Sequence, residues 1–133
     1  MNYLLDTHYV LWTLFNPEKI TSKVKEILLD SGSVKFVSTV NIWEISLKYR
    51  LGKLVLGELT PEQLYESVLE SGFVISEIEP VIYASYHHLP LKEDHRDPFD
   101  RMLIWQAINC DLTLLTADKK IKQYLEDGLK LVI

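Results

Sequence analysis

The sequence has little cysteine, little glycine and no long hydrophobic run, and each shortage excludes a class of protein. Its single cysteine, Cys110, cannot form an intramolecular disulfide, which excludes a disulfide-rich secreted scaffold and indicates a reducing compartment. The five glycines are isolated, so the sequence has neither a phosphate-binding P-loop nor the GxSxG elbow of serine hydrolases. The apolar runs are far shorter than the roughly 20 residues that a membrane span requires. We therefore expect a cytoplasmic protein without a targeting or membrane segment.

The chain also lacks an excess of positive charge. It has 14 lysines and arginines against 19 acidic residues, a net charge of −5 at pH 7. A protein that binds nucleic acid through a broad basic face normally carries the opposite sign. Any binding to nucleic acid would therefore need a local basic stripe or a bound cation.

The length and composition are those of one globular domain, which we expect to span residues 1–133. Of the 133 residues, 47% are hydrophobic and 25% are charged. A domain of this length buries roughly two-thirds of the surface that its unfolded chain exposes. It therefore needs no disulfide or structural metal to fold.

Short apolar runs alternate along the chain with segments of helical spacing. The apolar runs predict strands at residues 3–5, 34–37, 73–75, 112–115 and 129–133. Helices are predicted at 8–15, 21–32, 38–50, 60–72, 80–88, 98–110 and 119–126, and the polar segment 91–97 is predicted to be a loop. This alternation favours an α/β fold, a three-layer α/β/α sandwich with a mostly parallel central sheet. In such sheets, ligands bind outside the carboxyl ends of the strands.

Four acidic residues are predicted to lie near that edge. Asp6 directly follows a predicted strand, and Asp118 lies just past another. Glu44 and Asp100 lie on the apolar faces of helices, where a carboxylate loses hydration. Ordinary structural roles are also open to each of them. Asp6 and Asp118 precede helices and fit the N-cap position, and Glu44 has Lys48 four residues later as a partner.

If the four acids converge, they repel one another and favour a dication. Two carboxylates about 4 Å apart repel by roughly 4 kcal/mol at an effective dielectric constant near 20. Oxygen ligands alone favour Mg²⁺, with Mn²⁺ as a substitute. Such a metal lets an acidic protein bind a polyanion, and the matching reaction is hydrolysis of a phosphodiester bond by metal-activated water.

Four segments resemble those of the PIN domain family, most of all its VapC-type toxins from bacterial and archaeal toxin–antitoxin pairs. They are YLLDTHYVLW, TVNIWEISLK, HRDPFDRMLIWQA and LTLLTADKKI, and the resemblance covers essentially the whole chain. It implies an α/β/α sandwich with a metal-dependent ribonuclease site. It places the four acids of the family on Asp6, Glu44, Asp100 and Asp118, with Thr116 as the hydroxyl residue near the fourth. It also implies a cognate antitoxin that blocks the site, and a homodimer.

Neighbouring residues complete the expected site. Asp97 competes with Asp100 for the third acidic position, but it precedes Pro98 and fits the N-cap, so we expect Asp100 to bind the metal and Asp97 to act from the outer shell. Arg96, Arg101 and Lys119 flank the acids and are either phosphate contacts or part of a solvated charged face. The remaining candidates, His87, His88 and His95, are poorly spaced for zinc and are interpreted as surface or helix-end residues.

We therefore expect a Mg²⁺-dependent endoribonuclease that acts as a toxin on RNA. Asp6 and Asp100 would bind the metal, and Glu44 and Asp118 would bind metal or position water. The alternative is a catalytically silent PIN-like module that binds only RNA or a protein partner. The presence of all four acids argues against this alternative. The sequence does not identify the RNA, because such recognition depends on surface shape and RNA structure.

Overall fold

A computed structural model describes residues 1–133 and contains one five-stranded sheet in which every neighbouring pair of strands is parallel. Its strands are β1 (Asn2–Leu5), β2 (Val34–Ser38), β3 (Val74–Ser76), β4 (Thr113–Leu115) and β5 (Lys130–Val132). The order across the sheet is β3-β2-β1-β4-β5. In the central strand, Leu4 is in register with Phe36 on one side and with Leu114 on the other. The predicted parallel α/β architecture is therefore confirmed.

Helices connect the strands in the predicted order. The α-helices are α1 (Thr7–Phe15), α2 (Ser22–Leu29), α3 (Thr39–Arg50), α4 (Pro61–Glu70), α5 (Pro80–Ser85) and α6 (Pro98–Asn109). Three 3₁₀ helices complete the set: η1 (Pro17–Lys19), η2 (Tyr86–His88) and η3 (Lys119–Asp127). None of the helices is long and apolar enough to cross a membrane.

The last predicted helix, whose type the sequence did not specify, is a 3₁₀ helix. In η3 the buried residues are Ile121 and Tyr124, three positions apart. A 3₁₀ helix has three residues per turn, so this spacing places both side chains on one buried stripe. The backbone N–H of Ile121 donates to the carbonyl of Asp118, also across three residues.

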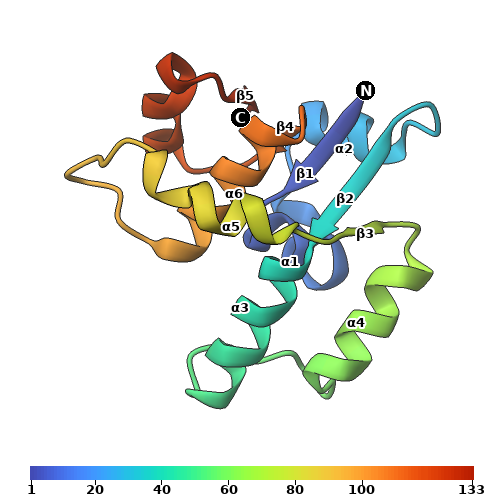
Figure 1. Cartoon of the computed structure of the whole chain (residues 1–133). Helices are drawn as coiled ribbons and strands as arrows, with labels where there is room; N and C mark the ends of the chain where they lie inside the picture. Colours follow the sequence, from blue (N-terminus) through green and yellow to red (C-terminus); the bar gives the residue numbers. More distant parts are fainter.

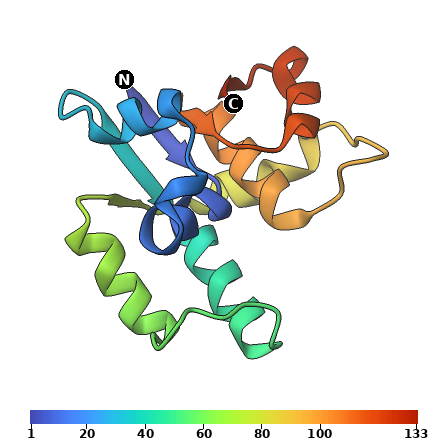
Figure 2. The same cartoon turned by 180° about the vertical axis from the view of Figure 1, so that it is seen from behind.

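Helices cover both faces of the sheet, as the sandwich prediction requires. Helices α5 and α6 lie over the face seen in Figure 1, and α1 and α2 lie over the opposite face, seen in Figure 2. Alternate residues of β1 pack against the helices on opposite faces of the sheet. Leu5 packs in a core with Val10 of α1 and Val24 of α2, whereas Leu4 packs with Leu103 of α6. Because Leu4 and Leu5 are both fully buried, β1 is the centre of the molecule.

Helices α3 and α4 pack against each other and project away from the sheet (Figure 1). The predicted start of α4 is observed as a capping box. The side chain of Thr60 accepts from the N–H of Gln63, and the side chain of Gln63 accepts from the N–H of Thr60. Helix α3 begins with an equivalent box between Ser38 and Asn41.

The carboxyl ends of β1, β2 and β4 meet at one edge of the sheet. From β1 the chain continues to β2 on one side, and it later returns to β4 on the other side. The gap between β1 and β4 is therefore the switch point at which open α/β sheets bind their ligands. Asp6 follows β1 and Asp118 follows β4, so both acids lie beside this switch point.

Candidate active site

Asp6 is a buried carboxylate at the end of β1. Its side chain is 5% exposed and caps α1, because Oδ1 accepts from the N–H of Tyr9 at 3.1 Å. Its other oxygen accepts from the hydroxyl of Thr116 at 2.5 Å. Burial raises the pKa of Asp6, although these two hydrogen bonds oppose the rise. Asp6 is therefore the N-cap of α1, as one interpretation of the sequence held. It is at the same time a buried carboxylate at the switch point.

Thr116 joins the first and fourth acids. It is fully buried after β4, and while it donates to Asp6 it accepts from the backbone N–H of Asp118 at 3.1 Å. Asp118 also caps η3 by accepting from the N–H of Lys120. Thr116 is the hydroxyl residue expected near the fourth acid, and its two contacts would hold both acids in place.

Glu44 is 3% exposed, and both of its oxygens accept hydrogen bonds. Thr7 donates to Oε1, and Thr7 in turn accepts from the side-chain amide of Asn41 at 3.0 Å. Lys48 forms an ion pair with Oε2. The i,i+4 pairing considered in the sequence is therefore present, and it brings a cation to the acidic site. Partial burial opposes the charge of Lys48, but Glu44, with Asp97 and Asp100, raises the pKa of Lys48.

Asp97 and Asp100 differ in the way the helix-face argument predicts. Asp97 is the N-cap of α6 and accepts from the N–H groups of Phe99 at 2.8 Å and Asp100 at 3.4 Å. The side chain of Asp100 makes no hydrogen bond of this kind and is 26% exposed. Its pKa is raised to about 7, first by burial and then by the surrounding acids Asp97, Asp6, Glu44 and Asp118. The charges of all the predicted acids therefore act on one carboxyl group.

His95 belongs to this site, which corrects its interpretation as a surface or helix-end residue. Its side chain is 4% exposed, and Nε2 lies 3.5 Å from Oδ2 of Asp100 and 3.9 Å from Oδ2 of Asp118. Ligand atoms of these three residues all lie within 4.8 Å of one another. Burial lowers the pKa of His95, although the charge of Asp118 opposes this effect. The signal was present in the sequence, because His95 lies five residues before Asp100 in the segment that positions the third acid.

Arg101 is not available to RNA, so its expected phosphate contact is corrected. It is 3% exposed, and its guanidinium donates to the hydroxyls of Tyr86 and Tyr124 and to the carbonyls of Leu89 and Pro90. Placement on the inner face of α6 turns this side chain away from solvent. The other two candidates for phosphate contact, Arg96 and Lys119, are exposed beside the acids.

Apart from Thr116, the residues that hold the site in place were not predicted from the sequence. Thr7 and Asn41 orient Glu44, and Tyr124 contacts His95. Thr7 follows the first acid directly, and Asn41 lies one helical turn before Glu44, so both spacings were visible. Tyr124 gave no signal, because its contact with His95 links positions 29 residues apart through the tertiary fold.

The donor set fits a divalent cation. Burial and the surrounding carboxylates raise the pKa of Asp100 to about 7, and Lys48 is the cation that pairs with the acids. Nε2 of His95 is also buried without a hydrogen-bond partner and faces two carboxylates. Carboxylate oxygens are the ligands that suit Mg²⁺ and Mn²⁺.

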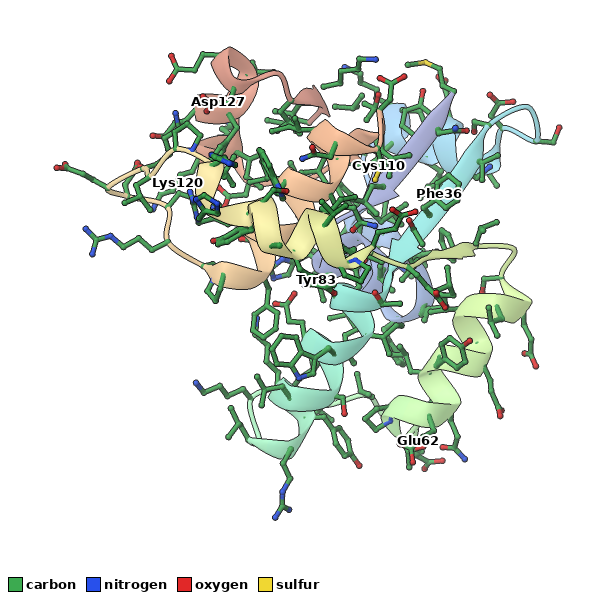
Figure 3. The ribbon with its side chains drawn as sticks, in the orientation of Figure 1. Phe36, Glu62, Tyr83, Cys110, Lys120 and Asp127 are labelled. Atoms are coloured by element: carbon green, nitrogen blue, oxygen red, sulfur yellow. The ribbon has the colours of Figure 1, made fainter.

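A cavity of about 500 Å³ adjoins the acids and shares His95 with them. It lies between the loop that precedes α6, η2 and α6 itself, and is lined mainly by polar side chains: Tyr86, Leu91, Lys92, Glu93, His95, Arg96 and Arg101. Lys92 pairs with Glu126 and Asp127, which fixes this loop to η3 (Asp127 is labelled in Figure 3). The acids themselves are not among the lining residues.

The sequence was compared with family models and with curated proteins. The model of the PIN domain family matches residues 3–126, which is nearly the whole chain. No curated protein matched the sequence. The family match covers all four predicted acids, from Asp6 to Asp118.

Solved structures with the same fold come from several bacterial complexes. One is a chain of VapBC2 from Rickettsia felis, in a complex with a DNA fragment from the VapBC2 promoter. The alignment covers 99% of this chain and 98% of that chain, with 19% identity and a TM-score of 0.68. A chain of VapBC-1 from nontypeable Haemophilus influenzae covers 99% and 97%, with 20% identity and a TM-score of 0.65. A chain of DNA-bound VapBC from Salmonella typhimurium covers 99% and 97%, with 16% identity and a TM-score of 0.64. At these identities the likeness establishes the fold.

Proposed function

The chain belongs to the PIN domain family, and from this membership and the geometry of its acids we propose that it is a Mg²⁺-dependent endoribonuclease that acts as a VapC-type toxin. The observation that carries the proposal is the environment of Asp100. Its carboxyl group is surrounded by four other acids, and its burial, followed by their charge, raises its pKa to about 7. A protein gains nothing in stability from such crowding, so a cation is the expected occupant.

Asp6 and Asp100 would bind the metal, with Asp118 and Glu44 as further ligands or as residues that position water. A bound dication would neutralise charge on the phosphate and make water a better nucleophile. The chain supplies the fixed parts of this arrangement. Thr116 holds Asp6, and Thr7 holds Glu44, each through a hydroxyl hydrogen bond. Both carboxylates are therefore oriented before substrate arrives.

The exposed basic residues beside the site would contact the RNA backbone. Arg96 lines the cavity next to His95, and Lys119 directly follows Asp118. Their contacts with phosphate would position the strand without reading its sequence. With a net charge of −5, the chain depends on the metal and on these few cations to attract RNA.

The expected partners follow from the same resemblance. The similar chains lie in VapBC complexes, two of them with DNA, which supports a cognate antitoxin for this chain. A buried acidic site can be blocked by an arginine of that partner, because a guanidinium makes bidentate contacts with carboxylates. We further propose that residues 1–133 act as a single nuclease domain, in the cytoplasm and as a homodimer.

One observation favours the alternative, a silent module that binds RNA or protein. Lys48 already pairs with Glu44 and so neutralises part of the site without metal. This pair does not involve the oxygens of Asp100 and Asp118 that face His95. The nuclease proposal accounts for those oxygens, and the silent module does not.

The proposal is tested by incubating the purified chain with total RNA in Mg²⁺ or in excess chelator, and by mapping the ends produced. We expect discrete cleavage in Mg²⁺ and none in chelator. Asp100→Asn should abolish cleavage, and Glu62→Gln is the charge-matched control, because Glu62 lies at the outer end of α4 (Figure 3). Cleavage that persists in chelator would refute the role of metal, and intact RNA under both conditions would favour the silent module.

A further inference from the structure

A line of buried side chains connects α6 to the acidic site. Arg101 Nη1 donates to the hydroxyl of Tyr124 at 2.8 Å, and the same hydroxyl lies 2.8 Å from Nδ1 of His95. Arg101, Tyr124 and His95 are 3%, 0% and 5% exposed. They come from α6, from η3 and from the loop before α6, so three separate elements fix this line.

The line determines which ring nitrogen of His95 carries the hydrogen. Arg101 can only donate, so the oxygen of Tyr124 must accept from it. The single hydrogen of the hydroxyl is then free to be donated. Nδ1 of His95 lies at 2.8 Å, whereas the other neighbouring acceptor, the carbonyl of His95, is at 3.5 Å. The hydrogen therefore goes to Nδ1, and a neutral ring must carry its own hydrogen on Nε2.

The hydrogen on Nε2 points into the acidic site. Nε2 is buried and has no hydrogen-bond partner. It lies 3.5 Å from Asp100, in the first turn of α6, and 3.9 Å from Asp118, which follows β4. An N–H donor placed between two carboxylates attracts both and reduces their mutual repulsion.

We propose that His95 is a positioning residue: Arg101 and Tyr124 fix it in the Nε2–H form, in which it holds Asp100 and Asp118 together as a pair of metal ligands. His95 does not bind the metal itself, because Nε2 has no free lone pair in this form. The inference rests on the proposed function in taking Asp100 and Asp118 as ligands. The form of the ring is a property of the metal-free chain and is tested separately.

The first test is NMR of the histidine ring nitrogens in the metal-free wild type at neutral pH, with assignment by comparison with His95→Gln. We expect the hydrogen on Nε2 and a bare Nδ1. Tyr124→Phe removes the donor, so its ring should shift towards a mixture of the two forms. A wild-type ring with its hydrogen on Nδ1 would overturn the inference, because Nε2 would then be free to bind metal.

The second test is Mn²⁺ affinity by calorimetry for His95→Leu and His95→Gln. Leucine removes the donor, and we expect affinity to fall by roughly tenfold or more, as for other residues that orient metal ligands. Glutamine restores an N–H donor and should recover most of the affinity. Equal losses in both variants would overturn the positioning role. His88→Gln, in the exposed part of η2, is the matched control.

Failure of this inference is distinguishable from failure of the proposed function. A wild type that binds no Mn²⁺ overturns both. A wild type that binds Mn²⁺ and cleaves RNA, but carries its hydrogen on Nδ1, overturns the positioning role alone. If His95→Leu fails to fold, the NMR comparison between wild type and Tyr124→Phe still decides the outcome.

Discussion

The hydroxyl of Thr116 donates to the carboxylate of Asp6 at 2.5 Å, although the two residues are 110 positions apart. The same oxygen accepts from the backbone N–H of Asp118 at 3.1 Å. One small side chain therefore connects the carboxylate after β1 to the backbone of the acid after β4. Thr116 therefore connects the two chain segments that leave β1 and β4 at the switch point.

Replacing Thr116 should loosen the site. Thr116→Val keeps the shape but removes the hydroxyl, so we expect Mn²⁺ affinity to fall by roughly tenfold to a hundredfold. The free energy of unfolding should fall by about 1–3 kcal/mol, because Asp6 loses a donor while buried. Thr116→Ser keeps the hydroxyl and is the control. Calorimetry and denaturant titration of both variants make the measurement, and unchanged Mn²⁺ affinity in Thr116→Val would contradict this role.

The contribution of Asp100 should make the metal-free chain more stable at acidic than at neutral pH. Folding raises the pKa of Asp100 from 3.8 to about 7, so between these values the folded state binds more protons than the unfolded state. The free energy of unfolding therefore decreases as pH rises through this window, by an amount on the order of 4 kcal/mol for the whole shift.

The check is the melting temperature in chelator at about pH 5, which lies inside this window, and at about pH 8, which lies above it. Asp100→Asn cannot ionise, so it should flatten this dependence and melt at a higher temperature than wild type at the higher pH. Glu62→Gln should follow the wild type. A wild type whose stability increases over this range, with Asp100→Asn showing the same increase, would contradict the raised pKa of Asp100.

Asp97 should act as a helix cap, whereas Asp100 should bind the metal. Asp97→Asn should bind Mn²⁺ with little loss, because asparagine caps a helix nearly as well as aspartate. Asp97→Ala should lower the free energy of unfolding by about 1 kcal/mol through loss of the cap. Asp100→Asn should abolish Mn²⁺ binding. If calorimetry finds the metal lost in Asp97→Asn and retained in Asp100→Asn, the two roles are exchanged.

Lys48 should compete with metal at Glu44. A dication that reaches Glu44 must displace the ammonium group paired with it. We therefore expect Lys48→Met to tighten Mn²⁺ binding about two- to fivefold, the worth of a partly exposed i,i+4 pair. Arg50→Met, on the exposed face of the same helix, should leave affinity unchanged. Weaker binding in Lys48→Met would show that the lysine supports the carboxylates instead.

The fold was predictable because its elements are marked locally. Thr60 and Pro61 are typical of a helix start and predict the beginning of α4, and the apolar run before Asp6 predicts the central strand. The convergence of the acids also followed from the sequence, since the carboxyl ends of parallel strands share one edge. What propensity could not distinguish was the 3₁₀ form of η3, because a stripe of two residues fits either helix.

The interior of the site was less predictable, because it depends on contacts between distant segments. Arg101 looks like a surface cation in the sequence, yet its position on α6 turns it inward to Tyr124 and the carbonyls of Leu89 and Pro90. His95 looks like a surface residue in the sequence, yet this network holds it buried beside Asp100. Charge and spacing along the chain do not show that Tyr124, from a distant segment, covers these two residues.

The most direct test of the central claim, that the converging acids form a metal-dependent ribonuclease site, is the rate of RNA cleavage as Mg²⁺ is titrated into the purified, chelator-treated chain. We expect no cleavage without metal, a saturable increase with Mg²⁺ in the wild type and in Glu62→Gln, and none at any concentration in Asp100→Asn. A wild-type rate that is independent of Mg²⁺, or an Asp100→Asn variant that cleaves like the wild type, would contradict the account.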